Sequence, residues 1–557
     1  MNKKIGVYLC LSVVLLSVVR AAEKPMNVLM IAVDDLNDWV GFLGGHPQAK
    51  TPNMDRLAAQ GMVFENAQCA ASVCNPSRAA TMSGIAPYVS GVYGNGDFMR
   101  DSAVLKNAVT LPRYFSNHGY TSMVRGKIFH HPSGDWADPQ SWDIFSDPRT
   151  DKRPVPIGQT TDMSPYKDMK VSNQLAVGGG VPIGWKGTME PKETTADYQN
   201  ALWAAQWLTD SAKQETPQPF FLACGIFRPH LPWNVPLEYY ARFELDKTRL
   251  PPIKDDDLAD IPGQSPSKEY TYALENGLRE EAAWAYLANC AYADDCVGVI
   301  LDALEKSPYR DNTIVVLWGD HGWHLGEKQR YKKFTLWEES ARMPFLIKVP
   351  GMTPGRTVCP VGLIDLYPTL VELCGLPEKD GLSGRSIVPV LENPVAEWAH
   401  PAITTMGAGN HSLRTERWRY IVRQGGPEEL YDHNNDPQEW TNLANNPEFA
   451  EVKARLKTFV PKAVAKEVER EEYVHPGIHH NKGKKGRLVP EFSQEVTEYT
   501  FTFKGDNVRW NYEGEARSVK INGQETRERS IRNPGTVTIE VIDKGGVKTT
   551  YTIKQSK

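Results

Sequence analysis

The stretch from Pro25 to Asp35, PMNVLMIAVDD, decides the fold class. Its apolar residues continue without a break as far as Val33, which is typical of a strand that is buried on both faces of a sheet. Two carboxylates, Asp34 and Asp35, follow at once. Ligands of open α/β sheets gather outside the carboxyl ends of the strands, so this pair is well placed to bind a metal ion. On these residues alone, a solvated turn is the alternative.

Two other apolar runs predict further buried strands. They are Pro219–Gly225 (PFFLACG) and Asn312–Leu317 (NTIVVL). The second run is followed by Asp320 and His321, so two strand ends that meet would bring together three carboxylates and one histidine. An oxygen-rich set of this kind suits Ca²⁺, with Mg²⁺ as the alternative. These runs therefore predict an α/β fold with a metal site at the edge of the sheet.

The segment Cys74–Gly84, CNPSRAATMSG, predicts a helix with a nucleophile at its start. Pro76 disfavours helix in the residue before it and suits the first turn of the helix that follows. The amide groups and the macrodipole of the helix N-terminus would then face Cys74, which favours an anionic substrate. A buried free cysteine beside an ordinary helix start is the alternative.

The Cys-x-Pro-Ser-Arg pattern of this segment resembles the signature of the formylglycine-dependent (type I) sulfatases, and the phrase TPNMDRLA at Thr51–Ala58 also occurs in that family. The resemblance implies that a separate maturase oxidises Cys74 to formylglycine (3-oxoalanine). The hydrated aldehyde has one hydroxyl to attack sulfur and a second to expel the bound sulfate. A serine could form the sulfate ester but would have no second hydroxyl to expel it.

The phrase GKIFH at Gly126–His130 looks like the iduronate-2-sulfatase branch, because most sulfatases carry the shorter Gly-Lys-Trp-His at this point. On that alignment Lys127 and His130 hold the formylglycine and the sulfate. His131 is the alternative to His130 in this role.

The spacing from Asp320 to Pro344 also resembles this branch, without a gap, and makes Lys333 the sulfate-binding lysine, with Lys332 as the alternative. The branch has Lys-Pro-His after an earlier strand, and its histidine, here His230, is the proton donor to the leaving alcohol. Arg228 stands where the branch has lysine. The planar guanidinium would recognise a substrate carboxylate or sulfate differently from a lysine.

The resemblance implies one set of roles for the site. Arg78, Lys127 and Lys333 would neutralise charge as it develops on the sulfuryl group. His230 would protonate the departing sugar oxygen, and His130 would assist loss of sulfate from the diol. The cation, Ca²⁺ or alternatively Mg²⁺, would polarise the sulfate oxygens and activate the diol. The predicted catalytic residues are Cys74, Arg78, Lys127, His130, His230 and Lys333, with Arg228 in substrate binding. The predicted metal ligands are Asp34, Asp35, the oxidised Cys74, Asp320 and His321.

The resemblance covers Asn27 to about Val464 and implies an alkaline-phosphatase-like α/β sandwich with a smaller α+β C-terminal subdomain. Beyond it, alternating segments predict a small appended β-domain. Trp510 or Tyr512 in that domain could bind carbohydrate, and a packing module is the alternative. The predicted organisation is a signal peptide (1–22), a catalytic α/β domain (23–395), a C-terminal subdomain (396–466), a linker (467–490) and the β-domain (491–557).

The N-terminus has the parts of a secretory signal peptide: a positive start at Met1–Lys4, an apolar run at Ile5–Val19 and a small-residue exit near Ala22. An uncleaved anchor is the alternative, but the run is short for a membrane span of about 20 residues. We therefore expect an exported protein, periplasmic or secreted, without a stable membrane span. The formal net charge of −5 gives no basic field, so nucleic acid is not an expected partner.

Other residues are assigned to structure rather than chemistry. Asp294 and Asp295 lie inside a long predicted helix, whose interior does not reach the strand ends. Cys359 and Cys374 could form a disulfide. Between Ser133 and Pro191, a composition rich in Asp, Pro and Gly predicts long loops.

The sequence thus predicts a sulfuric ester hydrolase that removes sulfate from a sulfated polysaccharide or its oligosaccharides, after processing by a formylglycine-generating maturase. One alternative is a phosphoester or phosphonate hydrolase of the same superfamily, although the Cys-x-Pro-Ser-Arg frame disfavours plain phosphatases, which use serine or threonine. The other alternative is a catalytically inactive polysaccharide-binding protein.

Overall fold

The computed structural model of the 557-residue chain describes residues 25–148, 155, 157, 159–175, 183–213, 218–462 and 464–468, and eight strands between residues 489 and 555. It divides into two compact units, Met1–Glu469 and Arg470–Lys557. The signal peptide predicted for residues 1–22 and nearly all of the linker predicted for 467–490 lie outside the described residues.

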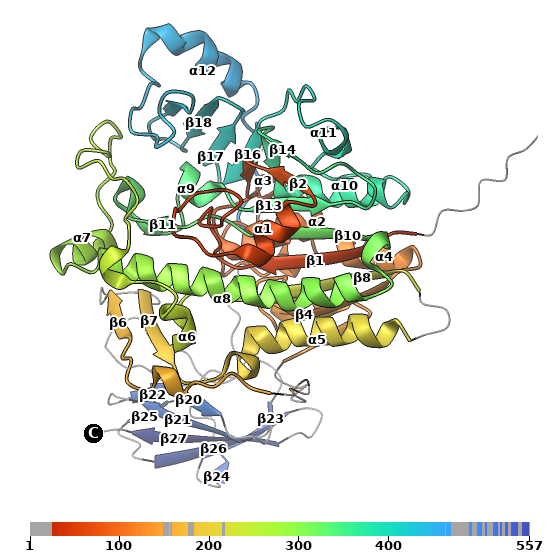
Figure 1. Ribbon diagram of the computed structural model, residues 1–557. Helices are drawn as coiled ribbons and strands as arrows, with labels where there is room; N and C mark the ends of the chain where they lie inside the picture. Colours follow the sequence, from red (N-terminus) through yellow and green to blue (C-terminus); the bar gives the residue numbers. More distant parts are fainter. Residues whose placement is uncertain are drawn as a thin grey trace, which may run out of the picture. The chain divides into compact units, whose positions relative to one another are not determined.

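An eight-stranded sheet forms the centre of the first unit (Figure 1). Strand β1 (Asn27–Val33) pairs in parallel with β10 (Thr313–Gly319) on one side and with β8 (Phe220–Ile226) on the other. Val33 lies opposite both Gly319 and Ile226, so all three strands end at the same edge. This confirms the α/β fold predicted from the three apolar runs. The outer strands are β14 (Gly355–Thr357), β2 (Met62–Phe64) and β13 (Phe345–Lys348) beyond β10, and β4 (Thr121–Gly126) and β5 (Ile144–Ser146) beyond β8.

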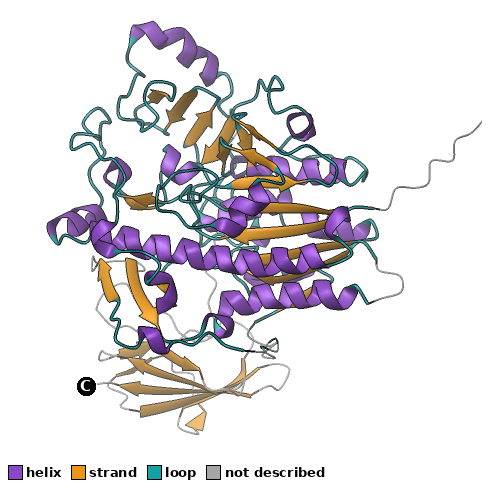
Figure 2. Cartoon of the chain, viewed as in Figure 1, coloured by secondary structure: helices purple, strands orange, loops and turns teal. Residues whose placement is uncertain are grey.

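Helices cover both faces of this sheet, as Figure 1 and Figure 2 show. The helices of the first unit are α1 (Pro52–Ala58), α2 (Cys74–Ser83), α3 (Pro87–Ser90), α4 (Leu111–Asn117), α5 (Ala196–Ser211), α6 (Leu237–Tyr240), α7 (Lys268–Glu275), α8 (Arg279–Lys306), α9 (Glu338–Ala341), α10 (Leu366–Leu373), α11 (Val388–Glu392) and α12 (Ala450–Lys457).

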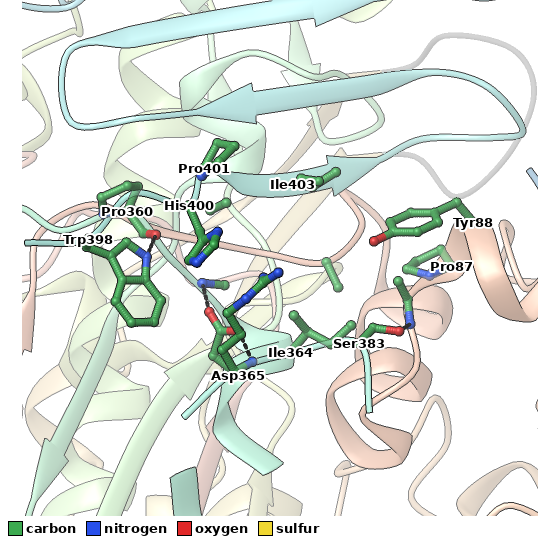
Figure 3. Close-up of a pocket in the computed structure, with 15 residues that line it drawn as sticks. Pro87, Tyr88, Pro360, Ile364, Asp365, Ser383, Trp398, His400, Pro401 and Ile403 are labelled. Atoms are coloured by element: carbon green, nitrogen blue, oxygen red, sulfur yellow. Dashed lines mark hydrogen bonds between the residues drawn. The ribbon is translucent and has the colours of Figure 1, made fainter. Parts of the chain in front are cut away.

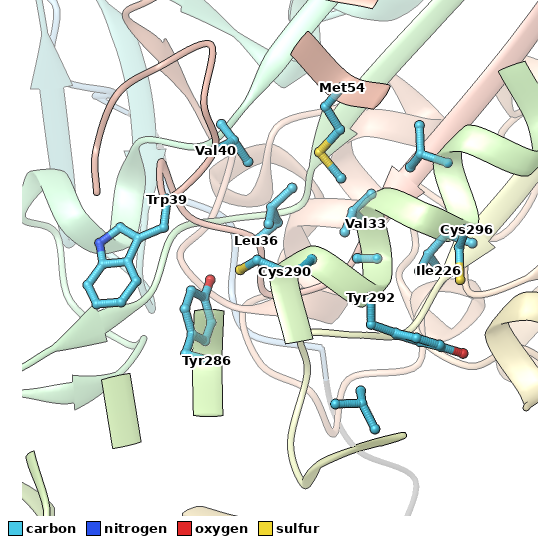
Figure 4. Close-up of a cluster of buried hydrophobic side chains, with 14 of the residues drawn as sticks. Val33, Leu36, Trp39, Val40, Met54, Ile226, Tyr286, Cys290, Tyr292 and Cys296 are labelled. Atoms are coloured by element: carbon cyan, nitrogen blue, oxygen red, sulfur yellow. The ribbon is translucent and has the colours of Figure 1, made fainter. Parts of the chain in front are cut away.

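Alternate residues of β1 pack on opposite faces, which explains why the whole strand is apolar. Leu29 and Val33 belong to a hydrophobic cluster that includes α5 and α8, whereas Val28 and Met30 belong to a cluster that includes α2, α4 and α10. Figure 4 shows part of the first cluster, where Cys290 of α8 lies among these side chains. Full burial of each such side chain contributes about 1.5–3 kcal/mol, so the two clusters hold the strand ends in fixed positions.

The composition of residues 133–191 predicts long loops, but the structure also has strands there. It contains β5 at the edge of the main sheet, and β6 (Ser172–Leu175) and β7 (Ile183–Thr188), which form a small sheet with β9 (Trp233–Pro236). Three of the four residues of β6 are exposed, so its sequence lacks the apolar alternation that marks a half-buried strand.

The C-terminal subdomain is an antiparallel sheet of four strands with α12 beside it. The strands are β16 (Ala402–Thr405), β17 (His411–Arg414), β18 (Trp418–Val422) and β19 (Glu429–Asp432). A cluster that includes Leu413, Tyr420 and Leu456 forms its core. The buried Arg419 pairs with Glu338 of α9 and with Glu439, which ties the subdomain to the main sheet. Two-residue strands complete the unit: β3 (Ala67–Gln68) with β15 (Val361–Gly362), and β11 (His324–Leu325) with β12 (Tyr331–Lys332).

The described residues of the second unit form strands, in agreement with the predicted small β-domain. Its six-stranded sheet has the order β20–β21–β27–β26–β23–β24, and β22 pairs with β25. Trp510 and Tyr512 lie outside the described residues. The strands are β20 (Val489–Phe492), β21 (Glu498–Phe503), β22 (Asn507–Arg509), β23 (Ala516–Ile521), β24 (Gln524–Glu525), β25 (Ser530–Arg532), β26 (Thr536–Asp543) and β27 (Lys548–Gln555).

Two smaller questions from the sequence are answered in the described part of the chain. Cys359 and Cys374 are both free, and their thiols face the backbone oxygens of Ala396 and Met26. Among the described helices, none is both long enough and apolar enough to cross a membrane.

Candidate active site

The residues predicted for the metal site and the nucleophile meet at one buried point, here called the central cluster (Asp34, Asp35, Cys74, Asp320 and His321). Asp34 and Asp35 follow β1, Asp320 and His321 follow β10, and Cys74 is the first residue of α2. The Cys74 Sγ lies 3.3 Å from His321 Nε2 and 3.8 Å from Asp35 Oδ1. His321 Nε2 also lies 3.3 Å from Asp35 Oδ1 and 3.5 Å from Asp320 Oδ2. All five side chains are buried.

The backbone of Asp35 adopts a conformation that residues other than glycine rarely take, with φ at 58°. Its N–H donates a hydrogen bond to Asp320 Oδ1 over 3.0 Å, and its carbonyl accepts one from the Tyr286 hydroxyl over 2.7 Å. Such a conformation costs about 1–3 kcal/mol and persists where neighbouring contacts hold it. These two hydrogen bonds therefore hold the strained backbone of Asp35 in place beside the cluster.

Arg78 connects three parts of the sheet edge. Its Nη2 donates to Asp34 Oδ1 over 2.9 Å and its Nε donates to Asp320 Oδ2 over 2.8 Å. Its Nη1 donates to the carbonyl oxygens of Lys127 and Ile128 over 2.6 and 2.9 Å. The guanidinium is completely buried, and it fixes the two carboxylates relative to the chain that follows β4.

Two lysines complete the charge balance. Lys127 Nζ lies 2.5 Å from Asp34 Oδ2. Lys333 Nζ lies 2.5 Å from Asp35 Oδ1 and donates to Cys74 Sγ over 2.9 Å. Three cationic side chains thus face three carboxylates, and one of the cations, Lys333, touches the predicted nucleophile.

The charges around Asp34 and Asp35 favour their ionised forms. Burial alone would raise the pKa of Asp34, but Lys127 and the neighbouring guanidinium hold that pKa well below its usual value. Burial also opposes ionisation of Asp35, yet His230 and Lys333 lower its pKa overall. The cluster is therefore set up to hold positive charge.

The central cluster has the donor set and the unsatisfied valence that a hard cation needs. The ligand atoms of Asp34, Asp35, Cys74 and His230 lie within 4.8 Å of one another, and so do those of Cys74, Asp320 and His321. The buried Asp35 Oδ2 has no hydrogen-bond partner among the described residues. With Nδ1 of His321 hydrogen-bonded to the carbonyl of its neighbour over 2.9 Å, the lone pair of Nε2 faces the cluster. Oxygen-rich donors of this kind fit Ca²⁺ or Mg²⁺.

The sequence left open whether Lys333 or Lys332 belongs to the site, and the structure distinguishes the two. Lys332 forms an ion pair of 3.0 Å with Glu269, whereas Lys333 enters the central cluster. The positive φ of Lys332, 72°, turns the chain between them.

The two histidines that follow β4 also differ. His130 is half-buried, and burial together with the charge of Lys127 lowers its pKa to about 2, so its ring is neutral. Its buried Nδ1 has no hydrogen-bond partner among the described residues. The His131 ring is exposed and lies 4.7 Å from the ring of His130. His130 is thus the histidine in electrostatic contact with the cluster.

His230 stands at the open side of the cluster. Its side chain is 25% exposed, and its Nε2 lies 3.9 Å from Asp35 Oδ2. Its Nδ1 is bonded to the carbonyl of Leu231 over 2.7 Å, which leaves Nε2 toward the cluster. Burial opposes protonation of His230, but Asp35 and Asp34 outweigh it and raise the pKa. An imidazolium beside a nucleophile can donate a proton to a leaving group.

Arg228 braces the loop that carries His230. Its Nε donates to the carbonyl of Asn234 over 3.1 Å, and its Nη1 donates to the carbonyl of His230 over 3.2 Å. The backbone N–H of Arg228 donates to the buried Asp197 of α5 over 2.9 Å. The substrate-binding role of Arg228 stays a prediction, because these contacts are all within the protein.

Three contacts of the site were missed by sequence reasoning. Tyr286 belongs to α8, which reads as scaffold, and only the fold brings its hydroxyl to Asp35. Asp197 lies in α5, which the sequence also indicates as scaffold, and it accepts a hydrogen bond from the Arg228 N–H. Ser77 donates to the Asp320 carbonyl over 2.6 Å. Its position inside the Cys74 motif could have marked it as a residue of the site.

Asp294 and Asp295 have the structural roles expected for them. Asp294 accepts hydrogen bonds from the N–H groups of Asn53 and Met54 at the start of α1. Asp295 pairs with Arg242 over 2.8 Å. Both carboxylates thus hold α8 to neighbouring segments.

Figure 3 shows a pocket that lies apart from the central cluster. Its lining includes Tyr88, Asp365, Trp398 and His400, and none of the cluster residues. Its volume of about 60 Å³ is well below the roughly 300–1,000 Å³ of typical ligand sites. This pocket is therefore not the substrate site.

Gly126 makes the position of Lys127 possible, and its replacement gives a prediction about stability. Its φ is +83°, and an added Cβ would lie 2.1 Å from the carbonyl oxygen of Gly225 on β8. We expect Gly126→Ala to lower the free energy of unfolding by about 1–3 kcal/mol, measured by urea denaturation. Gly119→Ala is the matched control, because Gly119 has a φ of +85° with open space around it. Equal losses in the two variants would contradict the clash.

The chain is similar to known sulfatases in sequence. Residues 26–376 match the family described as "Sulfatase", and residues 319–466 match "N-sulphoglucosamine sulphohydrolase, C-terminal". A "Sulfatase" of Formosa agariphila is 36% identical over 462 residues, which cover 80% of this chain and 88% of that protein. The "Iduronate 2-sulfatase" of Mus musculus is 28% identical, over 64% of this chain and 70% of that protein.

A solved structure has the same fold. It is that of BT4656 in complex with its substrate D-glucosamine-2-N,6-O-disulfate, with a TM-score of 0.60 and 20% sequence identity. The match covers 78% of this chain and 97% of that one. At this identity the likeness supports the alkaline-phosphatase-like fold of the first unit.

Proposed function

The chain belongs to the sulfatase family, and from the geometry of its site we propose that it hydrolyses sulfate esters of a sulfated carbohydrate with a formylglycine made from Cys74. The observation that carries the proposal is the position of Cys74. It opens α2, and its Sγ lies within hydrogen-bond distance of both His321 Nε2 and Lys333 Nζ. A nucleophile in contact with a lysine and beside carboxylates that can hold a cation is arranged to receive an anionic group.

A formylglycine supplies chemistry that the thiol lacks, since its hydrate carries one hydroxyl to attack sulfur and a second to release the sulfate. The residues around Cys74 would serve both steps. Lys333, in contact with Sγ, would stabilise the oxygen that attacks. Lys127 and the half-buried neutral His130 would bind a sulfate oxygen and assist proton removal when sulfate leaves. The maturase that makes the aldehyde is a required partner in this proposal.

Asp34, Asp35, Asp320 and His321 would hold Ca²⁺, with Mg²⁺ as the alternative, together with the oxygen of the modified Cys74. When bound, the cation supplies Lewis-acid polarisation of the sulfate oxygens. Arg78 would neutralise charge on the sulfuryl group and would also fix the spacing of Asp34 and Asp320. Four of its five N–H donors bind two of the carboxylates and two backbone carbonyls.

His230 would protonate the sugar oxygen as it leaves. Its Nε2 is the free nitrogen that faces the cluster, and the carboxylates of Asp34 and Asp35 favour the imidazolium. Arg228 would position this histidine through the carbonyl of His230 itself. A sugar alcohol is a poor leaving group, so this proton contributes most when the substrate is a sugar sulfate.

The pair Lys333 and Lys332 gives a direct prediction for activity. Lys333→Ala removes the cation that touches both Asp35 and Cys74, and we expect kcat to fall by about 10²–10³-fold. Lys332→Ala is the matched control, since that lysine pairs with Glu269 at the surface side of the hairpin, and we expect a change within about threefold. Initial rates of sulfate release would measure both. Equal effects in the two variants would contradict the assignment.

We also propose the domain limits and the location that the sequence predicts. Residues 1–22 would be removed as a signal peptide, and the exported protein, periplasmic or secreted, would consist of a catalytic domain to residue 395, a subdomain to 466, a linker to 490 and a β-domain. Sequencing of the mature N-terminus from the native host would test the first limit.

A substrate screen tests the proposed function. The full-length protein, co-expressed with a maturase, would be incubated with sulfated heparin and chondroitin disaccharides, with ulvan and carrageenan oligosaccharides, with choline sulfate and with a phosphonate monoester. Ion chromatography would measure the released anion. Sulfate release from a sugar supports the proposal, whereas release from choline sulfate or the phosphonate ester alone would refute the carbohydrate assignment.

A further inference from the structure

Four aromatic rings gather on the two segments that flank the start of α2, and we call them the aromatic wall (Phe98, His130, His131 and Trp136). The ring centroids of Trp136 lie 5.2 Å from Phe98, 5.7 Å from His130 and 5.8 Å from His131. Ring pairs at such separations are in packing contact. His130 follows Lys127 by three residues, and Lys127 Nζ lies 2.5 Å from Asp34 Oδ2, so one end of the wall lies beside the central cluster.

Hydrogen bonds from the N-terminal half of α2 fix both segments of the wall. Asn75, next to the predicted nucleophile, donates through Nδ2 to the carbonyl oxygens of Gly94 and Asp97 over 2.9 and 2.6 Å, directly before Phe98. The guanidinium of Arg78 in the same helix donates to the carbonyl oxygens of Lys127 and Ile128, three and two residues before His130. The position of the wall relative to Cys74 is therefore set by the helix that carries the nucleophile.

An ion pair behind the rings joins the two segments. Arg100 follows Phe98 by two residues, and Asp138 follows Trp136 by two residues. Arg100 Nε donates to Asp138 Oδ1 over 2.8 Å, and a second guanidinium nitrogen lies 2.5 Å from Oδ2. Both side chains are nearly buried, with 11% and 3% of their surface exposed. A paired fork of this kind is rigid, so the rings are held ready for a ligand.

The wall is partly open to solvent rather than part of the core. His131 is exposed, and Phe98 and Trp136 are half-buried. The rings meet at interplanar angles of 57° to 82°, so they form an aromatic cluster rather than one flat surface. An aromatic cluster beside a charged site suits a ligand that carries an anionic group on a ring with an apolar C–H face. The buried Nδ1 of His130, which has no hydrogen-bond partner among the described residues, adds a polar group at the foot of the wall.

We propose that the aromatic wall is the subsite for the sugar ring that carries the sulfate, with Trp136 as the surface on which the C–H face of that ring stacks. This inference rests on the proposed function, and it makes Trp136 a specificity-determining residue outside the central cluster. The carboxylate of Asp138 is already paired with Arg100, and Lys127 adds positive charge beside His130. Aromatic faces attract quaternary ammonium groups, but the positive charge of Lys127 beside the wall repels them and favours a neutral or anionic sugar.

The test compares Trp136→Ala and Trp136→Phe with the unchanged, matured full-length enzyme. The substrate is the oligosaccharide from which the screen above releases sulfate fastest. Choline sulfate is the second substrate, and inorganic sulfate is the competitive inhibitor that reports on the charged pocket alone. We expect Trp136→Ala to raise KM for the oligosaccharide by about tenfold or more, with kcat within about threefold. Trp136→Phe keeps an aromatic ring, so it should raise KM by only about threefold. The inhibition constant for sulfate should stay the same in all three proteins.

Each other outcome has a definite meaning. An unchanged KM in Trp136→Ala would overturn the subsite while the proposed function stands. Equal rises in KM and in the inhibition constant would show a general disturbance of the site and would also overturn it. Choline sulfate with the lower KM, lost in Trp136→Ala, would assign the wall to a quaternary ammonium group instead. If the unchanged enzyme releases sulfate from no sugar at all, the proposed function fails and the subsite fails with it.

Discussion

Cys74→Ser is expected to lose sustained turnover and to stop as a covalent sulfate ester. The serine hydroxyl would lie where Cys74 Sγ now contacts Lys333 and His321, so attack on sulfur remains possible. Release would fail because the ester has no second hydroxyl on the same carbon. We expect kcat to fall by about 10⁴-fold or more, as for removal of a nucleophile in other hydrolases.

Intact mass measurement after incubation with substrate would detect the trapped ester as a gain of about 80 Da, one sulfuryl group. Cys74→Ala should show neither turnover nor the gain in mass. Cys69→Ala is the matched control, because Cys69 is a buried thiol nearby that belongs to the hydrophobic cluster below α2. Full turnover by Cys74→Ser would contradict a formylglycine mechanism.

Asp35→Asn is expected to remove the bound cation and nearly all activity. Asp35 supplies an unpartnered buried oxygen to the central cluster, and it is the ion-pair partner of Lys333. The amide keeps the shape but loses the charge, and it leaves the buried Lys333 ammonium without that partner, which is costly in the interior. We expect kcat to fall by about 10³-fold and the Ca²⁺ content after dialysis to drop from about one per chain to near zero.

Asp38→Asn is the control for this variant. Asp38 lies three residues further along the same segment, but it pairs with Arg342 at 2.8 Å and not with the cluster. Its metal content should stay the same. In the unchanged enzyme, a chelator should abolish activity and added Ca²⁺ should restore it. Retention of Ca²⁺ by Asp35→Asn would contradict the proposed ligand set.

Some parts of the site could be predicted from the sequence because they depend on strand ends. The apolar runs before Asp34 and Asp320 indicate buried parallel strands, and parallel strands of one sheet finish at one edge. The meeting of their carboxylates follows from this topology. The Cys74 segment had a different basis: its helix follows from local rules, but its chemical meaning came from resemblance to a family.

Other parts depend on contacts between residues distant in the sequence, and local patterns do not contain them. The left-handed backbone of Asp35 is held by Asp320 and by the Tyr286 hydroxyl, both about 250 or more residues away. The two lysines at 332 and 333 look alike in sequence, and only the turn between them, with φ of 72° at Lys332, sends one into the site and the other to Glu269.

The aromatic wall illustrates the same limit. Trp136 lies in a stretch whose composition predicts loops, and nothing in its spacing marks it as part of a site. Its position follows from the Arg100–Asp138 pair and from the hydrogen bonds that α2 makes to both segments. Rings on irregular segments are placed by such long-range polar contacts, so local sequence patterns do not predict their positions.

The central claim is that Cys74 is converted to formylglycine, and mass spectrometry of the peptide that carries Cys74 tests it most directly. The protein would be taken from its native host or from cells that also express a maturase. We expect a loss of about 18 Da relative to the unmodified peptide, the difference between a thiol and an aldehyde side chain. An unmodified cysteine, in cells where the same maturase converts a control protein, would contradict it.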